Sequence, residues 1–103
     1  APSLTIIEQL LNLGAKIQVY DPEAMKEARK TFGNKIRYAK NNYDALKDAD
    51  ALILVTEWNE FRNPNFNKMK KLLKYPVVFD GRNHYSRQEM RELGFLYFSV
   101  GRP

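Results

Sequence analysis

Apolar and polar residues follow two different periods along this chain, and the two periods take turns. In the segment Ile6–Leu11 apolar residues recur at helical spacing, with Ser3 placed to cap a helix and Gly14 placed to end it. The segment Lys16–Tyr20 instead alternates polar and apolar residues, as strands do, and Asp21-Pro22 ends it. The chain is therefore predicted to begin with a helix followed by a strand.

The remaining residues continue this alternation to the end of the chain. The expected elements, in order, are a helix from Pro22 to about Phe32, a strand Ile36–Ala39, a short helix from Asn42 to Ala49, a strand Ala51–Val55, a basic helix with Met69, Leu72 and Leu73 on its buried side, a strand Val77–Phe79, a helix from Ser86 to Leu93 and a strand Phe95–Val100. The run Ala51–Val55 is continuously apolar, which is typical of a strand buried on both faces of a sheet.

Alternating strands and helices predict a parallel sheet, because parallel neighbours are joined by long crossovers that cover the sheet. We expect the fold class α/β: a three-layer, Rossmann-like domain with a mostly parallel sheet of about five strands and helices on both faces. A chain of 103 residues has the length of one domain, so we expect residues 1–103 to form a single domain. No G-x-G-x-x-G turn follows the first strand and no P-loop is present, so the sequence lacks both phosphate-binding fingerprints.

Three polar clusters directly follow predicted strands, and the carboxyl ends of a parallel sheet form a binding crevice. The clusters are Asp21-Pro22, Thr56-Glu57-Trp58 and Asp80-Gly81-Arg82-Asn83. Arg82 is the strongest candidate among them, because its planar guanidinium suits phosphate or carboxylate and so predicts an anionic ligand. The alternative is that Arg82 pairs with Asp80 or another neighbour and only fixes the loop, since such ion pairs are common.

Composition narrows the function classes further. The net charge is +5 at pH 7, but the basic residues are scattered over solvated helix faces without a nucleic-acid-binding motif, so we expect no nucleic-acid partner. The absence of cysteine excludes disulfides and thiolate sites within these residues, and a single histidine supplies no metal site. The longest apolar run is far too short to span a bilayer, so we expect a soluble, cytoplasmic protein without a membrane partner.

Six segments, taken in order, resemble one known family. They are Ala1-Pro2-Ser3-Leu4, then Gly14-Ala15 leading to Val19-Tyr20-Asp21-Pro22, Ala49-Asp50-Ala51, Thr56-Glu57-Trp58-Asn59-Glu60-Phe61, Asp80-Gly81-Arg82-Asn83 and Gly101-Arg102. Together they resemble the C-terminal, UDP-binding domain of the UDP-glucose 6-dehydrogenases, and the resemblance covers nearly the whole chain. The equivalent domains of GDP-mannose and UDP-N-acetylmannosamine dehydrogenases remain alternatives.

The resemblance implies an NAD-dependent, two-step oxidation of UDP-glucose to UDP-glucuronate that passes through a thiohemiacetal on a cysteine. This chain has no cysteine, so we expect it to be an inactive fragment with no catalytic or cofactor-binding residue of its own. In enzymes of this family an N-terminal domain binds NAD and a central helix builds the dimer. Those domains are the expected partners, the enzyme is expected to be a homodimer or larger, and a role mainly as a domain-docking module is a further alternative.

The resemblance also assigns roles around one loop. Arg82 matches the family arginine that contacts the substrate nucleotide, and Gly81 and Asn83 complete the expected substrate-binding set. Gly81 is expected to let the backbone approach the ligand or to take a positive φ, and Asn83 to hydrogen-bond locally or to the ligand, with pure turn geometry as the competing explanation for both. Asp80 is expected to orient the loop, because a carboxylate facing a diphosphate would be repelled. We expect Trp58 to pack and His84 to be structural.

Overall fold

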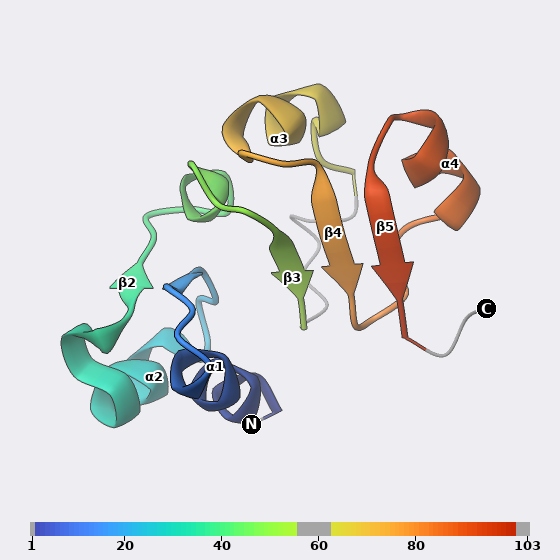
Figure 1. Ribbon diagram of the computed structural model, residues 1–103. Helices are drawn as coiled ribbons and strands as arrows, with labels where there is room; N and C mark the ends of the chain where they lie inside the picture. The colour runs from blue at the N-terminus through green and yellow to red at the C-terminus, as the bar shows by residue number, and fades with distance from the viewer. Residues whose placement is uncertain (1, 56–62, 101–103) are drawn as a thin grey trace. The chain divides into compact units, whose positions relative to one another are not determined.

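The computed structural model describes residues 2–55 and 63–100 of the chain (Figure 1). These residues form two compact units, which run Ala1–Ala45 and Leu46–Pro103 along the chain. Each unit has its own parallel strands and its own helices. The expectation that residues 1–103 form a single domain stays a prediction.

In the first unit, two helices accompany a pair of short parallel strands. Its elements are α1 (Pro2–Asn12), β1 (Gln18–Val19), α2 (Met25–Phe32), the 3₁₀ helix Gly33–Lys35, β2 (Arg37–Tyr38) and the 3₁₀ helix Asp44–Leu46, which reaches into the second unit. Helix α1 begins at Pro2, so Ser3 lies inside the helix and the predicted cap is wrong; a proline suits the first turn because no hydrogen bond is lost there. Gly14 has a φ of 91° beyond the last turn of α1, which confirms the predicted stop.

Helix α2 starts later than its sequence predicts, because the residues before it form a turn. The Asp21 carboxylate accepts hydrogen bonds from the backbone N–H of Glu23 at 3.0 Å and of Ala24 at 3.1 Å. An Asp side chain that bonds to the backbone two or three residues ahead stabilises such a turn. The helix therefore begins at Met25, three residues after Pro22.

A small apolar core holds the first unit together. Its buried members are Ile7, Ala28, Phe32 and Ile36, from α1, from α2 and from the chain between Lys35 and β2. Tyr38 of β2 packs against this core, and its hydroxyl donates to the carbonyl oxygen of Gly33 at 2.8 Å, where α2 ends. The helical periodicity of α1 and α2 thus reflects a real buried face.

The second unit alternates strands and helices as predicted. Its elements are β3 (Leu52–Leu54), α3 (Phe66–Leu72), β4 (Val77–Asp80), α4 (Arg87–Glu92) and β5 (Leu96–Ser99). The Ser86 side chain accepts a hydrogen bond from the backbone N–H of Glu89 at 3.3 Å, which confirms Ser86 as the cap of α4. The Asn65 side chain caps α3 in the same way, through the N–H of Lys68.

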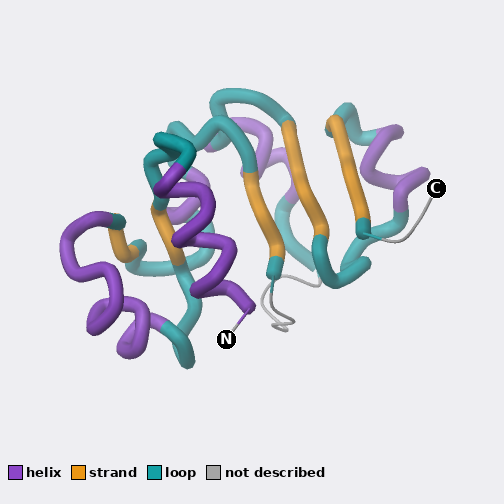
Figure 2. The backbone as a smooth tube through the Cα atoms, turned by 60° about the horizontal axis from the view of Figure 1, so that its bottom comes forward, coloured by secondary structure: helices purple, strands orange, loops and turns teal. Residues whose placement is uncertain are grey.

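Strands β3, β4 and β5 form one parallel sheet in that order, with all three arrows pointing the same way in Figure 1 and α4 beside β5 in Figure 2. One face of this sheet is buried: Val78 and Tyr97, which are register partners, are 0% and 3% exposed. Helices α3 and α4 contribute Met69 and Met90 to the buried interior, at 2% and 0% exposure. A regular hydrophobic layer therefore supports the carboxyl ends of these strands.

The opposite face of this sheet is open and apolar. Ile53, Phe79 and Phe98 are register partners across the three strands and are 40%, 43% and 52% exposed. The Phe79 and Phe98 rings stack with their centroids 5.0 Å apart. The interpretation of Ala51–Val55 as a strand buried on both faces is therefore wrong for Ile53, because an apolar run does not reveal which of its sides is covered.

The structure confirms the α/β class and the parallel pairing of the strands. It divides the described strands between a sheet of two and a sheet of three, where the sequence predicts a single sheet of about five. Observed strands are also shorter than predicted, since Lys16–Tyr20 contains only the pair Gln18–Val19. Strand β4 instead extends one residue beyond Phe79 to include Asp80.

Candidate functional site

The strongest candidate site is the loop that follows β4, residues 81–85, together with Asp80 at the end of the strand. Both neighbouring strands reach this loop through the backbone. The Gly81 N–H donates to the Leu54 carbonyl at the end of β3, at 2.8 Å, and the Val100 N–H donates to the Asp80 carbonyl, at 3.3 Å. The loop therefore lies at the carboxyl ends of the three parallel strands, which is where α/β proteins place ligands.

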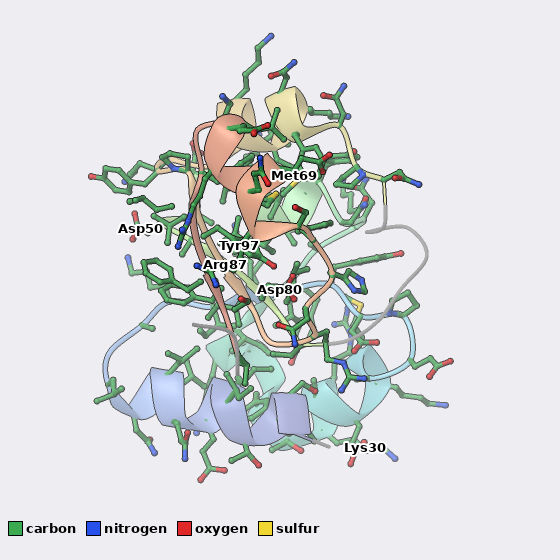
Figure 3. All side chains as sticks on the ribbon, turned by 90° about the vertical axis from the view of Figure 1, so that its right-hand side faces the viewer. Lys30, Asp50, Met69, Asp80, Arg87 and Tyr97 are labelled. Carbon is green, nitrogen blue, oxygen red and sulfur yellow. The ribbon has the colours of Figure 1, made fainter. Side chains whose placement is uncertain are left out.

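Asp80 anchors the loop through its side chain (Figure 3). Asp80 is 1% exposed as a residue, and its carboxylate accepts hydrogen bonds from the backbone N–H groups of Arg82 at 2.9 Å, His84 at 2.6 Å and Tyr85 at 3.1 Å. Bonds from N–H groups to a charged oxygen are stronger than neutral ones. These bonds confirm the expectation that Asp80 orients the loop.

Gly81 is required at its position by a close backbone approach. A Cβ atom added there would lie 3.0 Å from the carbonyl oxygen of Leu54. The interpretation of Gly81 as a residue with positive φ is wrong, because the glycines with positive φ are Gly14, Gly33 and Gly94 among the described residues. The glycine thus lets two backbones approach, and the partner backbone is that of β3.

Asn83 supplies the positive φ that the turn needs. Its φ is 56°, in the left-handed region that asparagine tolerates better than most residues. This conformation supports the turn-geometry interpretation of Asn83 and leaves its side chain on the exposed surface of the loop. Arg82 beside it is also exposed, while its backbone N–H is held by Asp80. The loop therefore combines a fixed backbone with two exposed polar side chains.

His84 takes part in the loop through its backbone and through packing. Its ring meets the Tyr85 ring edge-on, with centroids 5.8 Å apart. Its Nε2 atom is buried and has no hydrogen-bond partner in the described part of the chain. Tyr85 in turn packs edge-on against Phe66 of α3, at 5.3 Å. These contacts agree with a structural role for His84.

The sequence predicts three polar clusters at one sheet edge, and the structure describes two of them. Asp21 belongs to the first unit, where its carboxylate forms the turn before α2. The cluster Thr56-Glu57-Trp58, including the expected packing of Trp58, lies outside the described residues. The convergence of all three clusters is therefore a prediction, and the geometry of the site rests on the loop after β4.

Tyr97 of β5 belongs to the site but was not a candidate from the sequence. Its hydroxyl donates to the Asp80 carboxylate at 2.6 Å. The residue Tyr97 is 3% exposed. In the sequence Tyr97 is one of four apolar or aromatic residues in a row, Phe95–Phe98, which predicts only a strand. Only the register of the sheet would have indicated the contact between Tyr97 and Asp80. In the parallel sheet Tyr97 pairs with Val78, which lies two residues before Asp80 on the same face.

The described residues offer neither a metal-binding cluster nor a membrane-spanning helix. Residues 2–55 and 63–100 contain no group of three or more His, Cys, Asp or Glu side chains arranged to hold a metal ion. None of the described helices is both long enough and apolar enough to cross a membrane.

Comparison with known proteins identifies the family. The family model described as "UDP-glucose/GDP-mannose dehydrogenase family, UDP binding domain" matches residues 1–87. UDP-glucose 6-dehydrogenases of Bacillus subtilis and Rhizobium meliloti are 44% and 41% identical over 103 residues, the whole of this chain. The chain spans only 22% and 23% of the length of these two relatives.

A solved structure of a dehydrogenase shares the fold of this chain. The UDP-N-acetylmannosamine dehydrogenase of Pyrococcus horikoshii matches with a TM-score of 0.59 over 94% of this chain and 29% of its own, at 18% sequence identity. The fold is therefore shared with a part of a larger dehydrogenase. The match to residues 1–87 and the identity over the full length lead to one conclusion: this chain belongs to the UDP-glucose/GDP-mannose dehydrogenase family, as its UDP-binding domain.

Proposed function

We propose that this chain binds the nucleotide of UDP-glucose within an NAD-dependent dehydrogenase that oxidises UDP-glucose to UDP-glucuronate. The observation that carries the proposal is the position of Arg82, exposed on a loop that Asp80 fixes at the carboxyl end of a parallel sheet. The names of the relatives at 44% and 41% identity support UDP-glucose over a GDP-linked sugar. The neighbour named for UDP-N-acetylmannosamine supports only the fold, at 18% identity.

The chemistry of the loop suits a nucleoside diphosphate. Arg82 presents a planar fork of N–H donors that matches two phosphate oxygens at once. Asn83, the next residue, adds an exposed amide that both donates and accepts hydrogen bonds. Gly81 contributes by its lack of a side chain, since the loop lies against the end of β3 only because nothing separates the two backbones. Arg82, Gly81 and Asn83 are the proposed substrate-binding residues.

The oxidation itself belongs to other parts of the protein. Conversion of the C6 alcohol to a carboxylate removes four electrons, so it delivers two hydrides to two molecules of NAD and consumes one water. The sequence has no cysteine to serve as a nucleophile and no G-x-G-x-x-G turn for NAD. The proposed partners are therefore an NAD-binding domain and a central dimerisation domain of the same enzyme, which acts in the cytoplasm as a homodimer or larger.

The test is the affinity for UDP of the complete dehydrogenase, measured by isothermal titration calorimetry. A charge-assisted hydrogen bond to phosphate contributes about 1.5–3 kcal/mol, so Arg82→Ala is expected to weaken UDP binding roughly 10- to 100-fold. Arg82→Lys keeps the positive charge but lacks the planar fork of donors, so its UDP affinity is expected to lie between those of wild type and Arg82→Ala. Arg91→Ala, which removes an exposed arginine from the last turn of α4, is the matched control and is expected to bind like wild type. An unchanged dissociation constant in Arg82→Ala would contradict the proposal.

A further inference from the structure

We propose that Tyr97 is a positioning residue for nucleotide binding, acting on Arg82 through the carboxylate of Asp80. The inference rests on the proposed function and assigns a role to a residue that cannot reach the ligand itself, since Tyr97 is 3% exposed and its side chain lies on the buried face of the sheet. Among the described residues, its hydroxyl is the side-chain group that donates to the Asp80 carboxylate, while the other donors are backbone N–H groups of the loop. The positioning role of Tyr97 follows from which oxygen of Asp80 accepts each of these hydrogen bonds.

The two oxygens of Asp80 hold opposite ends of the loop. Oδ1 accepts the N–H of Arg82 at 2.9 Å, while Oδ2 accepts the N–H groups of His84 at 2.6 Å and Tyr85 at 3.1 Å. Rotation of the carboxylate about its last side-chain bond would disturb both ends together. The direction of the carboxylate plane therefore sets the position of the Arg82 backbone.

Tyr97 fixes that direction from the neighbouring strand. Its hydroxyl lies 2.6 Å from Oδ2 of Asp80 and 3.1 Å from the carbonyl oxygen of Tyr85. A hydroxyl has a single proton, and the shorter distance together with the charge on the carboxylate directs that proton to Asp80. The phenol ring is held in turn by the sheet, because Tyr97 pairs with Val78, which is fully buried.

The register explains why a tyrosine is suited to this position. Val78 and Asp80 point to the same face of β4, because side chains alternate along a strand. Tyr97, opposite Val78, is thus the diagonal neighbour of Asp80, at a separation that only a long side chain can bridge. A phenylalanine would fill the same volume and leave the carboxylate without this donor. Tyr97, itself fixed in the sheet, therefore holds the Asp80 carboxylate in place and through it the loop that carries Arg82.

The experiment is a double-mutant cycle on the complete dehydrogenase, with kcat and KM for UDP-glucose measured at saturating NAD. Tyr97→Phe is expected to raise KM about fivefold, as the loss of one hydrogen bond does, and to leave kcat within about twofold of wild type. Tyr75→Phe, at a residue that is 56% exposed, is the matched control and is expected to change neither constant. An unchanged KM in Tyr97→Phe would overturn the inference.

The cycle also separates positioning from general support of the fold. If Tyr97 acts through Arg82, then Tyr97→Phe added to Arg82→Ala raises KM no further. A fivefold rise in the Arg82→Ala background as well would overturn the inference, because the hydroxyl would then act independently of Arg82. If Arg82→Ala alone leaves KM unchanged, the proposed function of Arg82 fails. If Arg82→Ala raises KM and Tyr97→Phe does not, only the role of Tyr97 fails.

Hydrogen exchange gives a readout that does not depend on turnover. In the Tyr97→Phe enzyme without ligand, the amides of Arg82, His84 and Tyr85 are expected to exchange about fivefold faster than in wild type, because the carboxylate that accepts them is less well fixed. Amides of β4 before Asp80 are expected to exchange as in wild type. Equal exchange of the loop amides in the two proteins would overturn the inference.

Discussion

Gly81→Ala tests whether the loop owes its position to the close approach of two backbones. The added methyl would lie 3.0 Å from the Leu54 carbonyl oxygen, where ordinary contacts are 3.4 Å or longer. The same oxygen accepts the Gly81 N–H at 2.8 Å, so the chain relieves the contact only by moving the loop away and lengthening that bond. Overpacking and a weakened hydrogen bond together cost about 2 kcal/mol.

The assay is hydrogen exchange on the complete protein, combined with a titration of UDP. A loss of about 2 kcal/mol accelerates exchange at the end of β3 and in the loop roughly 30-fold, and the displaced Arg82 lowers UDP affinity roughly three- to tenfold. Gly14→Ala is the control, because Gly14 has a φ of 91° and open space around its Cβ position. It is expected to destabilise α1 and to leave UDP binding unchanged. Wild-type affinity in Gly81→Ala would refute the reasoning.

Two further variants probe the same loop. Asp80→Asn places an amide N–H₂ against backbone N–H donors whichever way the amide turns, so the opening free energy of the loop is expected to fall by about 2 kcal/mol, and exchange equal to wild type at Arg82 and His84 would count against the anchor. Asn83→Gly keeps the backbone free to adopt a φ of 56°, so stability is expected to hold while UDP affinity falls a few-fold; an unchanged affinity would assign Asn83 to the turn alone.

Much of the second unit could be predicted from the sequence, because its signals are local. The cap at Ser86, the stop at Gly94 with its φ of 93° and the strand before Asp80 each depend on a few adjacent residues. The role of Asp80 as the loop's anchor could also be predicted, since a carboxylate is unsuited to face a diphosphate. These predictions are confirmed by contacts within the loop and its neighbouring elements.

Features that depend on partners distant in the chain could not be predicted. Tyr97 bonds to a carboxylate 17 residues earlier, and Gly81 meets the end of β3, so neither contact is visible before the register of the sheet is known. The exposure of Ile53 on β3 could not be predicted for a related reason: in a continuously apolar run, the sequence does not show which side chains face solvent. Pairing and coverage are properties of the assembled sheet.

The central claim is that the loop after β4 binds the nucleotide through Arg82, and a crystal structure of the complete dehydrogenase with UDP tests it most directly. The account predicts the Arg82 guanidinium within about 3 Å of oxygen atoms of the nucleotide, with the Asp80 carboxylate still bonded to the loop and to Tyr97. UDP bound elsewhere, or bound with Arg82 turned away from it, would contradict the account.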